Sequence, residues 1–256
     1  MSPNSSEALA LRVDAGTLTW RGPALMLPAR SALAVVAQGL VAAVFALRSS
    51  PTPWHDAEPW LPVYGTLIDA GCLALLWRLT RREGISLVDL VGLERAHLAR
   101  DALLGVALVP ACLVFILGGV YAAGWLLYGT LTPPYLSGPL PLPAALYALL
   151  VWPFIWGLTE QMTYNGYLLP RFQVLGRNTT LAVGMVAFVW SLQHSFMPLT
   201  FDSRFMAFRL LSPIPQSVFV TLLYLRLRRV LPLAIAHALM DGATVLMGTL
   251  LPLVRA

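Results

Sequence analysis

The chain has 256 residues, of which 58% are hydrophobic and only 11% are charged. A soluble domain carries about 25% charged residues, so the composition excludes an ordinary water-soluble protein. We predict an all-α, polytopic membrane bundle, because a helix satisfies its own backbone polar groups within lipid. The net charge of +5 does not indicate nucleic-acid binding, since the seventeen basic residues are all arginine and cluster between apolar runs.

Seven apolar runs, each near the length of a membrane-crossing helix, follow one another along the chain. They cover residues 31–47, 59–77, 102–128, 144–170, 178–197, 210–225 and 230–251. We therefore predict about seven transmembrane helices in a single domain, residues 30–251, after an N-terminal segment, residues 1–29. Cys72 and Cys112 fall within these runs, which indicates packing residues rather than a disulfide.

The segments between the runs predict how the chain lies in the membrane. Residues 78–101 hold five arginines in an amphipathic pattern, which favours an interfacial segment on the membrane surface. Residues 129–143 are rich in proline and glycine and form a turn-rich break. Seven spans place all the arginine-rich segments on one side. We therefore expect an integral protein of the bacterial cytoplasmic membrane with a cytoplasmic N-terminus.

Few ionisable side chains lie inside the predicted spans: Asp69, Glu160, His194, His237 and Asp241. An acid at the bilayer centre costs about 2.5–3.5 kcal/mol on insertion scales, so each of these residues needs a partner or a function. Asp69 has no motif around it, and we interpret it as a structural residue that forms hydrogen bonds between helices. Glu160 is the only charged residue between Asp101 and Arg171.

The other four residues form a pattern that suggests chemistry. His237 and Asp241 are four residues apart and share a helix face. Glu160, His194 and His237 come from three helices, and one carboxylate with two imidazoles is a donor set for catalytic zinc. The same residues are also able to hold a water directly between Glu160 and His194. The spacing alone leaves both readings open.

The motifs of the chain resemble those of the CPBP family of intramembrane proteases. This family includes prenyl-protein (CAAX) endopeptidases and bacterial immunity and bacteriocin-processing proteins. Its pattern is Glu-Glu-x-x-x-Arg-Gly, then Phe-x-x-x-His, then His-x-x-x-Asn or Asp, on successive helices. The corresponding stretches here are Glu160–Gly166, Trp190–His194 and His237–Asp241. The resemblance covers approximately residues 60–250.

The resemblance implies an intramembrane endopeptidase that hydrolyses a peptide bond in a membrane-associated protein or peptide. Glu160, His194, His237 and Asp241 then take the family's catalytic positions. In one mechanism Glu160, His194 and His237 hold zinc, whose bound water attacks the peptide carbonyl. In the other, Glu160 is the general base, and His237 and Asp241 stabilise the oxyanion. Either mechanism predicts a peptide-wide cavity open to the cytoplasmic leaflet.

Three positions depart from the family pattern, of which Trp190 exchanges one large aromatic residue for another and matters least. Gln161 and Asn165 stand where the pattern has its second glutamate and its arginine. These positions are i,i+4 neighbours, where an acid and a base would pair. Replacing both leaves two amides that are able to bond to each other and strands no buried charge. We interpret the two amides as a compensated structural pair, with Glu160 retaining the chemistry.

Other functions and one geometric difficulty remain. A catalytically inactive scaffold or regulator of the same fold is one alternative. A proton-coupled transporter is another, although the sequence shows no paired repeats. At 1.5 Å per residue, Glu160 lies ~16 Å from Arg171, whereas His194 lies ~25 Å from Arg177. Straight helices would leave His194 offset from Glu160 by about 10 Å, which we expect tilt or kinks near Pro153, Pro198 and Pro232 to make up.

Overall fold

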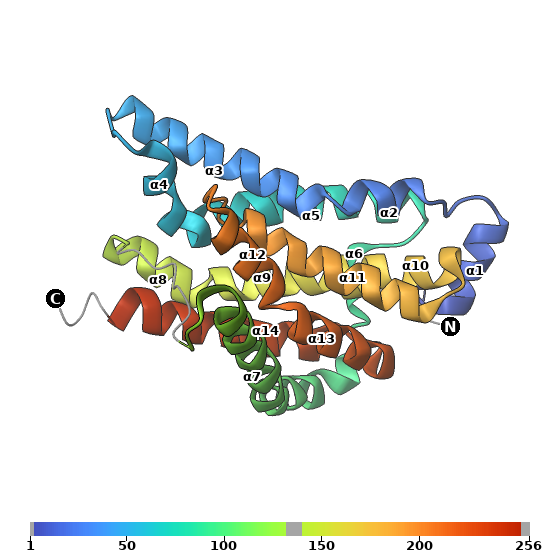
Figure 1. Ribbon diagram of the computed structural model, residues 1–256. Coiled ribbons are helices and arrows are strands. Elements are labelled where there is room, and N and C mark those ends of the chain that lie inside the picture. Colours follow the sequence, from blue (N-terminus) through green and yellow to red (C-terminus); the bar gives the residue numbers. More distant parts are fainter. Residues whose placement is uncertain (1–2, 132–139, 252–256) are drawn as a thin grey trace.

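The computed structural model describes residues 3–131 and 140–251, and within these ranges all regular structure is helical, without a strand. Figure 1 shows an elongated bundle in which the longer helices run beside one another. The predicted all-α bundle is confirmed. The middle of the predicted turn-rich break, 132–139, and the last five residues lie outside the described residues.

The helices differ widely in length. The α-helices are α1 (Ser6–Asp14), α2 (Arg21–Met26), α3 (Ala29–Leu47), α4 (Pro53–Ala57), α5 (Leu61–Arg82), α6 (Leu87–Val91), α7 (Leu98–Tyr128), α8 (Leu142–Leu150), α9 (Trp152–Gln161), α10 (Leu169–Gly176), α11 (Thr179–Gln193), α12 (Ser203–Leu211), α13 (Ile214–Leu227) and α14 (Leu231–Val245). The 3₁₀ turns are η1 (Glu58–Trp60), η2 (Arg95–His97) and η4 (His194–Phe196), and the π-helical turns are η3 (Met162–Leu168) and η5 (Leu246–Leu250).

Several helical stretches are long and apolar enough to cross a membrane. Within the described residues there are five: Arg21–Leu47, Pro53–Arg82, Leu87–Tyr128, Ser203–Leu227 and Leu231–Leu250. A sixth forms if α8 and the stretch Trp152–Gly176, bent by 41°, count as one span. Large apolar side chains on α7, such as Leu103 and Val114, are exposed, and a bilayer would cover them. The chain is an integral membrane protein with five or six such helices among the described residues, close to the predicted seven; the predicted span 178–197 is not among them, because α11 has only 15 residues.

Three predicted boundaries need correction. The first helical stretch begins at Arg21, so Arg30 lies inside it instead of at its edge. The run 144–170 is not one straight helix. It breaks at Val151, because Pro153 lacks the N–H that would continue α8 and favours the first turn of a new helix. The predicted interfacial segment is also shorter than expected, since α5 continues to Arg82 and α7 begins at Leu98.

The arginine-rich segments meet at one end of the bundle. One recess there is lined by the N-terminal residues 3–6, by residues between 88 and 100, and by residues between 224 and 229. Arg228 also donates to Gln173, at the end of α10. This arrangement agrees with the one-sided distribution that seven spans predict. The cytoplasmic location of this end, and the division at residue 30, stay predictions.

The hairpin of α10 and α11 removes the predicted offset between Glu160 and His194. The chain turns at Arg177, after which the Asn178 side chain caps α11 by accepting from the Leu181 backbone N–H at 2.9 Å. Counted from this turn, Glu160 precedes Arg177 by about as many residues as Gln193 follows it. The expected offset was wrong because it took Arg171 as the membrane boundary, whereas Arg171 is fully buried.

Close packing of α9 on α14 brings Glu160 near His237. Gly157 stands at the crossing, and a Cβ there would lie 3.0 Å from the Ala234 carbonyl oxygen and 3.3 Å from His237 Cβ. Only a glycine permits this approach without displacement of a backbone.

Both buried cysteines, Cys72 and Cys112, are free, as predicted.

Candidate active site

Glu160 is fully buried near the end of α9, and both of its carboxylate oxygens accept hydrogen bonds. Trp190 Nε1 donates to Oε2 at 2.6 Å, and Gln193 Nε2 donates to Oε1 at 2.7 Å, both from α11. Arg30 Nη2 lies 3.4 Å from the same Oε1. Charge-assisted bonds of this kind stabilise a carboxylate that has lost its water. Glu160 is therefore held in one orientation by residues of α3 and α11.

Arg30 joins this carboxylate to Asp69. Arg30 lies on α3 and its side chain is fully buried; its Nη1 donates to Asp69 Oδ1 at 2.8 Å. Its Nε donates to Gln193 Oε1 at 3.0 Å, and its guanidinium lies 4.4 Å from the ring centroid of Trp156. The interpretation of Asp69 as an interhelical structural partner is confirmed. The interpretation of Arg30 as a flanking charge is wrong, because its partners come from α5, α9 and α11.

His237 and Asp241, both on α14, complete the polar cluster. His237 Nε2 lies 3.8 Å from Glu160 Oε2 and 3.5 Å from Asp241 Oδ2. These separations exceed a direct hydrogen bond, and a water bonded to both atoms of such a pair lies beside the line that joins them. Asp241 Oδ2 has no hydrogen-bond partner among the described residues. The geometry therefore leaves an acceptor and an imidazole directed at a shared space beside Glu160.

The amide pair next to Glu160 orients this imidazole. Asn165 Nδ2 donates to Gln161 Oε1 at 2.7 Å, so the predicted bond between the two amides is confirmed. With its oxygen occupied, Gln161 turns its Nε2 toward His237 Nδ1, 3.4 Å away. Because an amide nitrogen only donates, this contact favours the tautomer in which Nδ1 accepts and the imidazole carries its proton on Nε2. The pair thus does more than fill space: it directs the His237 N–H toward Glu160 and Asp241.

His194 is the predicted residue without a direct bond to the others among the described residues, although it lies within electrostatic range of Glu160 and His237. It begins η4, directly after Gln193, and its Nδ1 lies 2.9 Å from the Trp190 carbonyl oxygen. Among the described residues it forms no hydrogen bond or ion pair with Glu160, His237 or Asp241. The structure therefore brings three of the four predicted residues together and leaves the fourth one turn further along α11 and η4.

The residues as placed do not fit a three-ligand zinc site. Within the described part of the chain, no three His, Cys, Asp or Glu side chains are grouped so as to hold one ion. Both oxygens of Glu160 are already bonded to N–H donors, whereas the bond of His194 Nδ1 to the Trp190 carbonyl leaves Nε2 available as a ligand. Zinc ligands must approach the ion to about 2.0–2.2 Å. Zinc ligation by Glu160, His194 and His237 stays a prediction.

The site opens on one side. Glu160 is completely shielded, whereas the side chains of His237 and Asp241 are 14% and 23% exposed. A substrate would therefore reach the carboxylate past α14.

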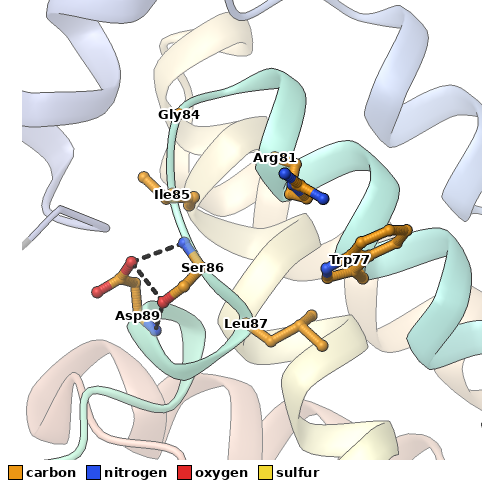
Figure 2. A pocket seen from close by; sticks show the side chains of 7 residues that line it. All are labelled: Trp77, Arg81, Gly84, Ile85, Ser86, Leu87 and Asp89. Atoms are coloured by element: carbon orange, nitrogen blue, oxygen red, sulfur yellow. Dashed lines mark hydrogen bonds between the residues drawn. The ribbon is translucent and has the colours of Figure 1, made fainter.

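Two recesses lie elsewhere on the molecule, away from this site. One, of about 580 Å³, is lined by Trp77, Arg81, residues 84–87 and Asp89 (Figure 2), and the other is the recess at the arginine-rich end. Neither contains a predicted site residue, and the peptide-wide cavity stays a prediction.

Three residues of the site were missed by the sequence interpretation: Arg30, Trp190 as a donor, and Gln193. Arg30 carries a signal in hindsight, since apolar residues flank it on both sides and Pro28 does not interrupt the helical stretch around it. Gln193 has a weaker signal, its position beside His194. No pattern in the sequence shows that either side chain reaches Glu160.

One of the comparisons with known proteins gives a match, and it spans the region that contains this site. Residues 142–243 match the family model described as type II CAAX prenyl endopeptidase Rce1-like. The match runs from α8 into α14 and includes Glu160, His194, His237 and Asp241. It confirms the predicted resemblance to CPBP intramembrane proteases and supports a CAAX-type protease. No curated protein and no solved structure matches the chain.

Proposed function

We propose that the chain is an intramembrane endopeptidase of the CAAX type, which hydrolyses a peptide bond in a membrane-associated protein or peptide. Glu160 Oε2 and His237 Nε2 face each other across 3.8 Å in an otherwise enclosed polar cluster, and this observation carries the proposal. The family match supports the reaction class, since it covers the motifs that supply both residues.

The arrangement assigns a role to each group. A water in the shared space beside these two atoms transfers a proton to Glu160 as its oxygen attacks the carbonyl carbon of the scissile bond. The His237 Nε2–H donates to the oxyanion that forms, while Asp241 keeps this N–H directed into that space. Glu160 then returns the proton to the amide nitrogen as the C–N bond breaks. The products are a carboxylic acid and an amine, so one water is consumed per bond.

Substitution of Glu160 tests this proposal. Glu160→Gln keeps the size of the side chain and an acceptor for one of its two N–H donors but is unable to take a proton, so kcat should fall by about 10²–10⁴. Glu94→Gln is the matched control, because Glu94 is exposed on the connector before α7. The assay uses purified chain in proteoliposomes and membrane-anchored peptides with and without a prenyl group. Equal cleavage by Glu160→Gln and the unchanged chain would refute the proposal.

A chelator separates the two water-activating mechanisms. Zinc held by Glu160, His194 and His237 predicts loss of cleavage on chelation and recovery with added metal. General-base catalysis by Glu160 alone predicts no change. His194→Ala adds a second measure, because it removes a zinc ligand but leaves the bonds of Glu160 intact. A scaffold or regulator, by contrast, would keep its cellular effect in Glu160→Gln.

A further inference from the structure

One buried cation faces two carboxylates at the site. Arg30 donates to Asp69 at 2.8 Å and lies 3.4 Å from Glu160, and all three side chains are completely shielded. A buried carboxylate is unfavourable unless a partner compensates its charge. Among the described residues, Arg30 is the only arginine that forms an ion pair with Glu160.

Arg30 also controls how Glu160 is oriented. Its Nε donates to Gln193 Oε1, which additionally accepts from the Tyr164 hydroxyl at 2.8 Å. With the amide oxygen held on this side, Gln193 Nε2 must point to Glu160 Oε1. Oε1 is therefore fixed by Gln193 and Arg30, and Oε2 is the oxygen that faces His237. Loss of the guanidinium would remove the charge partner of Oε1 and one of the two donors that hold the Gln193 amide, leaving only the Tyr164 hydroxyl.

We propose that Arg30 is a positioning residue of the active site: it compensates the charge of Glu160 and turns the catalytic oxygen toward His237. The inference rests on the proposed function. It assigns part of the machinery to α3, outside the matched residues 142–243. The competing explanation is that Arg30 serves only Asp69, as one more buried ion pair that holds α3 on α5.

A charge-balanced double variant separates the two explanations. Arg30→Met strands two carboxylates, so both the melting temperature and kcat should fall. Arg30→Met with Asp69→Asn removes one positive and one negative charge, so it should recover the part of the melting temperature lost through the stranded Asp69, while Glu160 stays without its cation. If Arg30 positions Glu160, kcat of this double variant stays about 10- to 100-fold below that of the unchanged chain, with KM little altered. If kcat recovers together with the melting temperature, Arg30 is only structural and the proposal fails.

A second buried ion pair supplies the matched control. Arg171 and Glu83 pair in the same way, but away from Glu160. For Arg171→Met with Glu83→Gln, the melting temperature and kcat should recover together. Arg30→Lys should restore part of kcat, because lysine keeps the charge but lacks the planar fork that reaches Asp69, Gln193 and Glu160 together. No rescue by lysine, with the fold intact, would contradict compensation of charge.

One measurement keeps this inference distinct from the proposed function. Arg30→Met should lower the melting temperature less when Glu160 is already Gln, since only Asp69 is then stranded. This coupling is measured without any substrate. If it is present and the unchanged chain cleaves nothing, the proposed function fails while the contact between Arg30 and Glu160 stands. If it is absent, the inference fails whether or not the chain is a protease.

Discussion

Two buried arginines, Arg30 on α3 and Arg171 on α10, belong to two polar clusters whose surroundings differ. The continuous helical segment α9–η3–α10 contributes Glu160 to the first cluster and Arg171 to the second. The Arg30 cluster comprises Arg30, Asp69, Glu160, Trp190 and Gln193, and the Arg171 cluster comprises Arg171, Glu83, Tyr167 and Asn4. Arg30 and Arg171 are both fully buried, although each reads as a flanking charge in the sequence.

The Arg171 cluster is balanced and closed. Arg171 Nε lies 3.1 and 3.0 Å from the two oxygens of Glu83, and its Nη1 donates to Asn4 Oδ1 and to the Tyr167 carbonyl. The Tyr167 hydroxyl donates to Glu83 at 2.9 Å. One cation therefore meets one anion, and neutral groups take the remaining bonds. Such a cluster holds helices together without a group left to react.

The Arg30 cluster has one more carboxylate than cations and an open side. Arg30 is shared between Asp69 and Glu160, and Asp69 Oδ2 has no hydrogen-bond partner among the described residues. Beyond Glu160 lie His237 and Asp241, which are partly exposed. The comparison teaches that burial of an arginine does not by itself separate structure from function. What distinguishes the Arg30 cluster is its unpaired carboxylate oxygen and its accessible side.

The largest expected difference between the clusters is in stability. Glu83→Gln leaves Arg171 buried without an anion and should cost about 3–5 kcal/mol. Glu160→Gln should cost only about 1 kcal/mol, because Arg30 keeps Asp69. Denaturant unfolding of both variants in mixed micelles measures the difference. Equal losses would mean that both clusters contribute equally to stability, which would contradict the proposed difference between them.

The second largest effect on stability is expected at the crossing of α9 and α14, which positions His237 beside Glu160. Gly157→Ala should cost about 1–3 kcal/mol and lower kcat, because the added methyl pushes α9 away from α14. Gly184→Ala on α11 is the matched control. A Cβ there meets nothing within 4 Å, so this change should stabilise the helix by about 0.5–1 kcal/mol. Unfolding and cleavage are measured on both. Unchanged cleavage by Gly157→Ala would show that the approach of α14 is not needed.

The amide pair should give a smaller effect. Gln161→Ala and Asn165→Ala should be coupled by about 0.5–1.5 kcal/mol in a double-mutant cycle, the value of one neutral hydrogen bond. Gln161→Ala should lower kcat more than Asn165→Ala, since only Gln161 contacts His237. Additive effects on stability, with equal effects on kcat, would contradict a role for the pair in orienting the imidazole.

The smallest effect is expected outside both clusters, at the recess of Figure 2. Ser86 caps α6 by accepting from the Asp89 N–H, while Asp89 Oδ2 accepts from the Ser86 N–H at 2.8 Å. Ser86→Ala should cost about 0.5 kcal/mol, the lower end for an N-cap, because the Asp89 bond to the backbone remains. Cleavage should not change. A loss of cleavage in Ser86→Ala would mean that kcat falls whenever the bundle is destabilised. Changes in kcat would then not distinguish the two clusters.

The sequence by itself determined the class of the protein and its local contacts. Hydropathy predicted an all-α membrane bundle, because lipid admits few other structures, and the i,i+4 spacing predicted the bond between Gln161 and Asn165. The motifs also named the three helices that carry the site. These features depend on composition or on residues within one helical turn, so they need no knowledge of neighbouring helices.

Only the tertiary structure decided which charges meet. Arg30 and Glu160 are 130 positions apart in the chain, and helical periodicity tells which face a residue is on but not what lies against that face. For the same reason Arg30 and Arg171 were indistinguishable from boundary arginines, and the level of Glu160 was misjudged. Pairing of buried charges follows from the packing of helices that are distant in sequence, so the division between a balanced cluster and a reactive one is a property of the folded bundle.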